Sequence, residues 1–160
     1  MFAFLYFTLW SMLLMIAETL LRSAGLTVPL LAFFYVAASF AVSPWMALCF
    51  AMVFGVTQDF VMGCFVPWDG LVLPVLTLPA VFLHAKRPGS DALEFLAGAM
   101  IPLVAAIPSA WTVLTTPEAF ASLLTSCLLG AILMPVFFSL VSRSSDRLRI
   151  GVWNAGDGGE

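Results

Sequence analysis

The chain has 160 residues, of which 62% are hydrophobic and only 9% are charged, and its mean hydropathy is +1.10. Soluble domains carry about 45–50% apolar and about 25% charged residues, so this chain lacks the charged side chains that a soluble surface needs. The composition therefore predicts an all-α integral membrane protein. The net charge is −3 and the chain has no long basic run, which excludes a nucleic-acid-binding protein.

Six apolar segments follow one another along the chain, separated by short stretches that contain Gly or Pro. They cover residues 2–21, 28–42, 45–66, 71–83, 92–114 and 119–141. A hydrocarbon core of about 30 Å needs about 20 helical residues, so the first, third, fifth and sixth segments are long enough to cross it. The second and fourth are shorter and fit tilted helices packed against neighbours, or a re-entrant pair.

These segments predict a compact bundle of about six transmembrane helices, with four spans as the main alternative. Residues 1–142 form a single polytopic membrane domain in this prediction, and residues 143–160 form a short cytoplasmic tail. The first segment lacks the positive region of a secretory signal, so we expect it to be retained as a span.

The basic residues predict the orientation, because Lys and Arg are retained on the cytoplasmic side. With six spans, five of the six basic residues lie on the side of both termini, which is therefore expected to be cytoplasmic. Those five are Lys86, Arg87, Arg143, Arg147 and Arg149, and only Arg22 lies on the opposite side.

Asp59 stands out because it lies inside the third apolar segment, about 10 Å from its outer end. Ala51, Gly55, Asp59 and Gly63 recur every four residues and share one narrow helix face. Small residues on such a face allow a second helix to approach closely. We favour a helix contact with a hydrogen-bonded carboxylate over a proton or ligand relay, or a contact with a partner protein.

A second polar pair is predicted at the outer end of the first segment. Glu18 and Arg22 are four residues apart, in the favourable order for an ion pair on a helix. Arg22 is the only cation expected on this side, so Glu18 and Asp59 would share it or compete for it. The alternative is a solvated surface pair that contributes little to stability.

The sequence offers little for catalysis or for a cofactor. It contains no nucleophile elbow, zinc-protease motif or Gly-rich phosphate loop, and Asp59 is the one clear polar candidate at depth. The histidine and the three cysteines lack metal-ligand spacing, so no metal is expected. Prolines within the fourth, fifth and sixth segments favour fold-shaping kinks over the broken helices of transporters.

The pattern around Asp59 resembles that of the bacterial rod-shape-determining MreD family, whose members are small chains made almost entirely of membrane spans. The matching residues are Gly55, Asp59, Gly63, Pro67 and Gly70. The resemblance implies a non-enzymatic inner-membrane subunit of the elongation machinery that builds lateral peptidoglycan.

The same resemblance implies partners and a fold. Members of the family bind the periplasmic scaffold MreC and, through it, the actin-like MreB and the wall-synthesising glycosyltransferase and transpeptidase. Their fold is similar to the six-helix substrate-binding subunits of energy-coupling-factor vitamin transporters. A vitamin-binding transporter subunit is therefore the alternative function, although Trp68, Asp69 and Glu118 supply few polar groups for a substrate.

Overall fold

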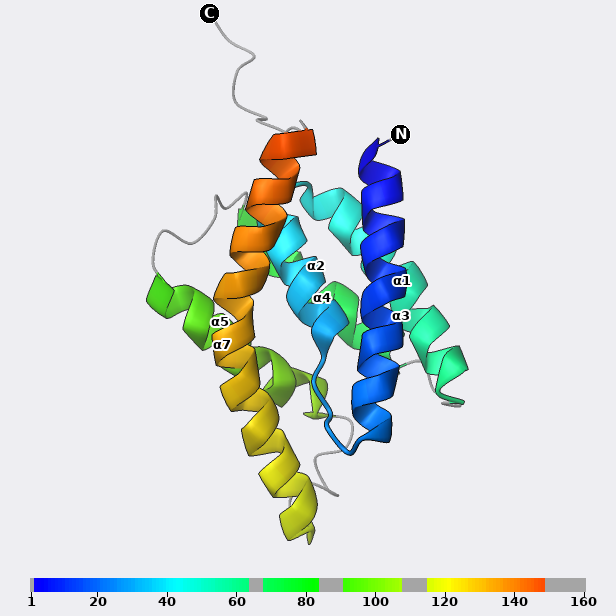
Figure 1. The fold of residues 1–160 in the computed structure, drawn as a ribbon, viewed down its shortest axis with the longest axis vertical. Helices are drawn as coiled ribbons and strands as arrows, with labels where there is room; N and C mark the ends of the chain where they lie inside the picture. The colour runs from blue at the N-terminus through cyan, green and yellow to red at the C-terminus, as the bar shows by residue number, and fades with distance from the viewer. Residues whose placement is uncertain (1, 64–67, 84–90, 108–114, 149–160) are drawn as a thin grey trace, which may run out of the picture.

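The computed structural model describes residues 2–63, 68–83, 91–107 and 115–148. Within these ranges the chain is helical, and its main elements are six α-helices. They are α1 (Phe2–Ser23), α2 (Leu30–Ala41), α3 (Pro44–Val61), α4 (Trp68–Leu83), α5 (Asp91–Ala105) and α7 (Pro117–Leu148). Successive helices run in opposite directions, so α1 begins and α7 ends at the same end of the bundle (Figure 1).

The shortest of these six helices, α2, lies at the centre of the bundle, with α1 and α7 on either side of it (Figure 1). Its side chains from Leu30 to Ser39 are buried, and Phe33, Phe34 and Tyr35 are completely so. A helix that is apolar on all sides is expected to be surrounded by protein or lipid. Since neighbouring helices cover α2, it does not need the length of a membrane span.

Two pairs of helices approach each other closely at glycines. A Cβ on Gly55 of α3 would lie 2.6 Å from the Asp69 carbonyl oxygen of α4. A Cβ on Gly98 of α5 would collide with the Gly130 carbonyl of α7, and the reverse also holds. These are contacts of backbone against backbone, which only small residues permit.

The surface reverses the usual distribution of a soluble protein. Large apolar side chains are exposed along all of the described helices except α2. Buried positions include Glu18, Gln58, Asp59 and Glu94. Scattered exposed apolar residues are normal, but a continuous apolar exterior indicates a nonpolar surrounding. The chain is thus an all-helical protein compatible with a helical membrane protein.

Three of the helices are long and apolar enough to cross a membrane: Phe2–Ser23, Pro44–Val61 and Pro117–Ser145. The prediction that the fifth segment is also long enough is wrong for the described residues, because α5 ends at Ala105 after 15 residues. Pro102 removes one helical N–H, and the sequence places Pro108 just beyond, which disfavours a helical residue before it.

The third segment was predicted to be helical to residue 66, but α3 ends at Val61. Gly63 follows with a φ of 69°, in the left-handed region where glycine commonly terminates a helix. Its N–H donates to the Phe60 carbonyl oxygen at 3.1 Å. Asp59 therefore lies only two residues from the end of its helix, nearer to the end of the bundle than the sequence predicted.

Candidate functional site: a buried polar network

A network of buried polar side chains lies at the end of the bundle where α1 and α3 end and where α2 and α4 begin. Its members are Glu18 and Arg22 of α1, Gln58 and Asp59 of α3, and Asp69 of α4. The network therefore links three helices by side chains, and a fourth, α2, through its backbone.

Glu18 is the centre of this network and is only 2% exposed. Its Oε1 accepts hydrogen bonds from Arg22 Nη2 and from Gln58 Nε2, both at 2.7 Å. Its Oε2 accepts from the backbone N–H of Leu31 at 3.2 Å. Leu31 lies in the first turn of α2, where N–H groups lack a helical acceptor.

Glu18 therefore caps α2 from a different helix. The N-cap residue of α2 is Pro29, which makes no side-chain capping bond. A carboxylate near a helix amino terminus is also stabilised by the helix dipole. A single buried side chain thus joins α1, α2 and α3.

Asp59 caps the amino terminus of α4, as Glu18 caps that of α2. Its carboxylate is buried, and Oδ2 accepts a hydrogen bond from the backbone N–H of Gly70 at 2.9 Å. Gly70 is the third residue of α4, so this N–H also lacks an acceptor within its own helix. The sequence-based expectation that Asp59 faces a neighbouring helix matches this geometry.

The glycines explain how Asp59 reaches this N–H. A Cβ on Gly55 would lie 2.9 Å from the Gly70 Cα, and a Cβ on Gly70 would lie 3.2 Å from the Val56 nitrogen. Real Cβ atoms essentially never come within 3.0 Å of such an atom, and 3.2 Å is tighter than nine in ten real Cβ contacts. Gly55 and Gly70 therefore allow the start of α4 to lie directly against α3, within reach of Asp59.

Arg22 connects α1 to α4. Its Nη2 lies 2.7 Å from Glu18 Oε1 and 3.2 Å from Asp69 Oδ2, and about a third of its side chain is exposed. The prediction that Glu18 and Asp59 share Arg22 is therefore wrong for Asp59, whose place is taken by Asp69. The alternative of a solvated surface pair is also wrong, because Glu18 is buried.

The charges of the network are balanced by more than Arg22. Glu18 and Asp69 lie against the Arg22 guanidinium. Glu18 and Asp59 lie at the amino termini of α2 and α4, each equivalent to roughly half a positive charge. Gln58 adds a neutral donor to Glu18. The arrangement is suited to holding helix ends together, because each buried carboxylate accepts at least one hydrogen bond from a neighbouring helix.

The remaining predicted positions fall into different environments. Ala51 is completely buried on the same face of α3 as Gly55. Gly63 does not share this face, because it lies beyond the helix end and a Cβ there would meet no described atom within 4 Å. The prediction that Gly63 packs against a helix is therefore wrong. Pro67 lies outside the described residues.

Two members of the network, Gln58 and Asp69, were not recognised from the sequence as partners of these carboxylates. Gln58 is the only glutamine of the chain and directly precedes Asp59 within an apolar stretch, which is a usable signal. Asp69 precedes the fourth apolar segment of the sequence, whereas the structure places it in the first turn of α4. Only the three-dimensional structure brings it to Arg22.

A cavity of about 310 Å³ adjoins the exposed side of the network. Its polar lining consists of Arg22, Asp69, Thr27 and Ser122. Thr27 and Ser122 are hydrogen bonded to each other at 3.0 Å. The apolar lining consists of Pro29, Pro102, Ala105, Ala106, Ala119 and Leu123. Its volume falls within the range of about 300–1,000 Å³ that small-molecule sites occupy.

Among the described residues, no group of three or more His, Cys, Asp or Glu side chains is arranged to hold a metal ion. Comparison of the chain with models of known protein families, with curated proteins and with solved structures finds no match in any of the three. What the fold itself defines is the class: an all-helical protein in which three of the described helices could cross a membrane.

Proposed function

We propose that this protein is a non-enzymatic inner-membrane subunit of the bacterial cell-elongation complex, similar to the MreD family. One observation carries most weight: the buried carboxylates are used to join helices. Asp59 accepts from Gly70 of the next helix, and Glu18 accepts from three groups on three helices. Such a network stabilises a scaffold and leaves its central carboxylate surrounded by protein.

The proposed topology has six spans with both termini in the cytoplasm. Its support is the alternating direction of the helices, with the start of α1 and the end of α7 at one end of the bundle (Figure 1). The positive-inside rule supports the orientation, because the proposed topology assigns five of the six basic residues to the cytoplasmic side. The short helices α2, α4 and α5 would be accommodated by packing against longer neighbours and by local thinning of the bilayer.

Single cysteines in a cysteine-free background test this topology. Cysteines at positions 89 and 150 are expected to react with a membrane-impermeant thiol reagent only after the inner membrane is opened. Labelling of either in intact spheroplasts would contradict the proposed orientation.

The proposed partners follow from the family resemblance alone. They are an MreC-like periplasmic scaffold and, through it, an MreB-like actin and the enzymes of lateral peptidoglycan synthesis. The bilayer itself is the other partner, and the exposed apolar side chains of the helices support that assignment.

Depletion in a rod-shaped host tests the function. Cells are expected to become round and wide, and the MreC-like scaffold should no longer co-purify with its membrane partners. Retention of rod shape together with lost uptake of a vitamin would overturn the proposal and favour transport.

The alternative function, a vitamin-binding subunit of a transporter, draws support from the cavity beside Arg22 and Asp69. Its four polar residues could hold a small polar ligand, and Pro102 borders it from within α5. Co-purification of the protein with a pair of ATPases, together with a small molecule released on denaturation, would support this alternative.

A further inference from the structure

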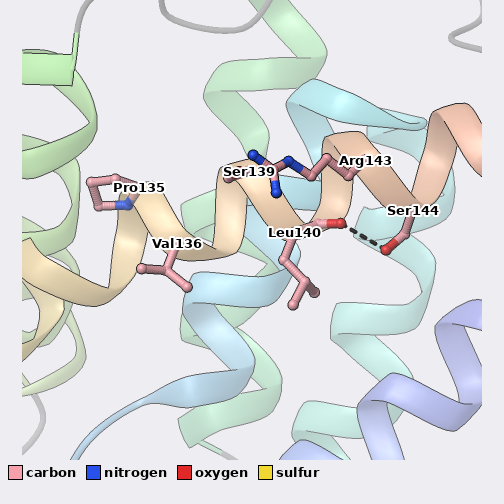
Figure 2. Close-up of a pocket in the computed structure, with 6 residues that line it drawn as sticks. All are labelled: Pro135, Val136, Ser139, Leu140, Arg143 and Ser144. Atoms are coloured by element: carbon pink, nitrogen blue, oxygen red, sulfur yellow. Dashed lines mark hydrogen bonds between the residues drawn. The ribbon is translucent and has the colours of Figure 1, made fainter.

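A groove runs along one face of α7 near the end of that helix, at the opposite end of the bundle from the polar network. It is lined by Pro135, Val136, Ser139, Leu140, Arg143 and Ser144 and has a volume of about 560 Å³. These residues form neighbouring pairs that recur every four residues, so they make one stripe along the helix (Figure 2). The stripe changes from apolar at Pro135 and Val136 to cationic at Arg143.

The length of the stripe fits one leaflet of a bilayer. Eight residues separate Pro135 from Arg143, which corresponds to about 12 Å along a helix. Half of a hydrocarbon core measures about 15 Å. An acyl chain could therefore lie along Val136 and Leu140 while its headgroup lies at the level of Arg143.

Arg143 is exposed. The two ion pairs found among the described residues are both made by Arg22, so Arg143 takes part in neither. Its side chain extends back along α7 toward Ser139 (Figure 2), as expected because helical side chains tilt toward the amino terminus. In the proposed topology this direction is toward the membrane interior. A guanidinium placed there is costly unless an anion accompanies it.

A further donor lies beside the groove. Tyr6 of α1 is buried and has its hydroxyl directed toward Ser144, yet it forms no hydrogen bond of normal geometry with any described residue. Ser144 itself donates to the Leu140 carbonyl oxygen at 2.7 Å (Figure 2). Ser144 therefore uses its proton within α7, and Arg143 supplies the charged donors of the groove.

We propose that this groove binds an anionic phospholipid, with one acyl chain along Val136 and Leu140 and the phosphate at Arg143. An apolar stripe of leaflet length that ends in a single exposed cation matches the chemistry of such a lipid. A zwitterionic lipid would bring a second positive group to the same guanidinium. This inference requires only that the chain lies in a membrane, and it does not depend on the proposed cellular role.

Native mass spectrometry of the full chain in detergent tests the proposal. Phosphatidylglycerol and phosphatidylcholine with identical acyl chains are titrated separately, and the dissociation constants of the first bound lipid are compared. We expect phosphatidylglycerol to bind about fivefold more tightly, which is the contribution of roughly one basic residue near an anionic lipid.

Three variants locate the site. Arg143→Gln should remove most of the preference, whereas Arg147→Gln, which deletes the same charge one turn further along the chain, should retain it. Ser139→Trp should fill the groove and weaken binding of both lipids. Both Arg143→Gln and Arg147→Gln should keep the thermal midpoint of the parent.

Three results would overturn the proposal. The first is equal binding of the two lipids by the parent protein, and the second is an equal loss of preference in Arg143→Gln and Arg147→Gln, which would indicate a diffuse basic surface. The third is full competition by water-soluble glycerol phosphate, which would show that only the headgroup is bound and that the apolar stripe has no part.

Discussion

The contact between α3 and α4 and the contact between α5 and α7 are both made at glycines, but they differ in chemistry. At the first, Gly55 lies against Asp69 and Gly70, and Asp59 adds a hydrogen bond to the start of α4. At the second, Gly98 and Gly130 lie against each other's carbonyl groups in the middle of two helices. One contact is anchored by a carboxylate at a helix end, and the other depends on backbone fit.

This difference shows that small residues have two uses in the same bundle. Near the end of α3 they let α4 approach closely enough for the Asp59 carboxylate to accept the hydrogen bond from the Gly70 N–H. Between α5 and α7 they set the distance between two helix axes. Substitutions at the two contacts should therefore lower the free energy of unfolding for different reasons. Between α5 and α7 the loss comes from packing, and between α3 and α4 it comes from packing and from a lost hydrogen bond.

The largest effect is expected for Gly130→Leu. Any Cβ at this position collides with the Gly98 carbonyl and lies 2.8 Å from Phe33 Cζ, so α5 and α7 must separate. We expect a loss of about 3 kcal/mol in the free energy of unfolding, at the upper end for overpacking. Unfolding by sodium dodecyl sulfate titration in mixed micelles measures it. Ala121→Leu, on the exposed side of α7, is the control and should change little.

Gly55→Leu is expected to cost about 2 kcal/mol, because overpacking at a helix terminus is relieved by a smaller movement than at mid-helix. The start of α4 can shift away, but Asp59 then loses its hydrogen bond to Gly70. Val53→Leu, at an exposed position of the same helix, is the matched control. A Gly55→Leu protein as stable as this control would refute the close contact.

Substitution of Asp59 separates capping from packing. Asp59→Ala removes the acceptor for Gly70 N–H and should cost about 1–2 kcal/mol, the usual value for loss of a helix cap. Asp59→Asn keeps an acceptor oxygen and should retain most of the stability and of the complex. Folded yield after purification and pull-down of the MreC-like partner measure both. An Asp59→Asn protein that folds and assembles normally but lacks function would show that the charge or proton of this residue is needed.

Gly63→Ala should have the smallest effect. A Cβ there meets none of the described atoms within 4 Å, so the cost is that of a left-handed conformation, about 1 kcal/mol. The same titration measures it, and Gly63→Asn should lose less, because asparagine tolerates this conformation better. A loss as large as that of Gly55→Leu would reinstate a packing role for Gly63.

The sequence predicted the helix face of Asp59 correctly but was wrong about one of the residues that share this face. The four-residue repeat of Ala51, Gly55 and Asp59 placed it on a packing face, because side-chain direction follows from helix periodicity. The same spacing wrongly included Gly63, since periodicity holds only while the helix continues. Whether a glycine continues a helix or terminates it depends on its φ angle, and the apolar pattern does not report that angle.

The ion pair illustrates a similar division. Glu18 and Arg22 meet at 2.7 Å because they are four residues apart on one helix, which is a local property. The other contacts of this pair are long-range. Glu18, which is buried, bonds to Gln58 and Leu31, and Arg22 contacts Asp69. These interactions join residues 13 to 47 positions apart. None of these follows from spacing along α1.

The sequence by itself therefore determined the helical class, the number of apolar segments and the polar residues that interrupt them, because composition and periodicity are local properties of the chain. The tertiary structure alone decided which helix amino terminus each carboxylate caps, where α3 and α5 end, and which glycines touch backbone. Those outcomes depend on the distances between helices, and such distances are set by the packing of residues far apart in the sequence.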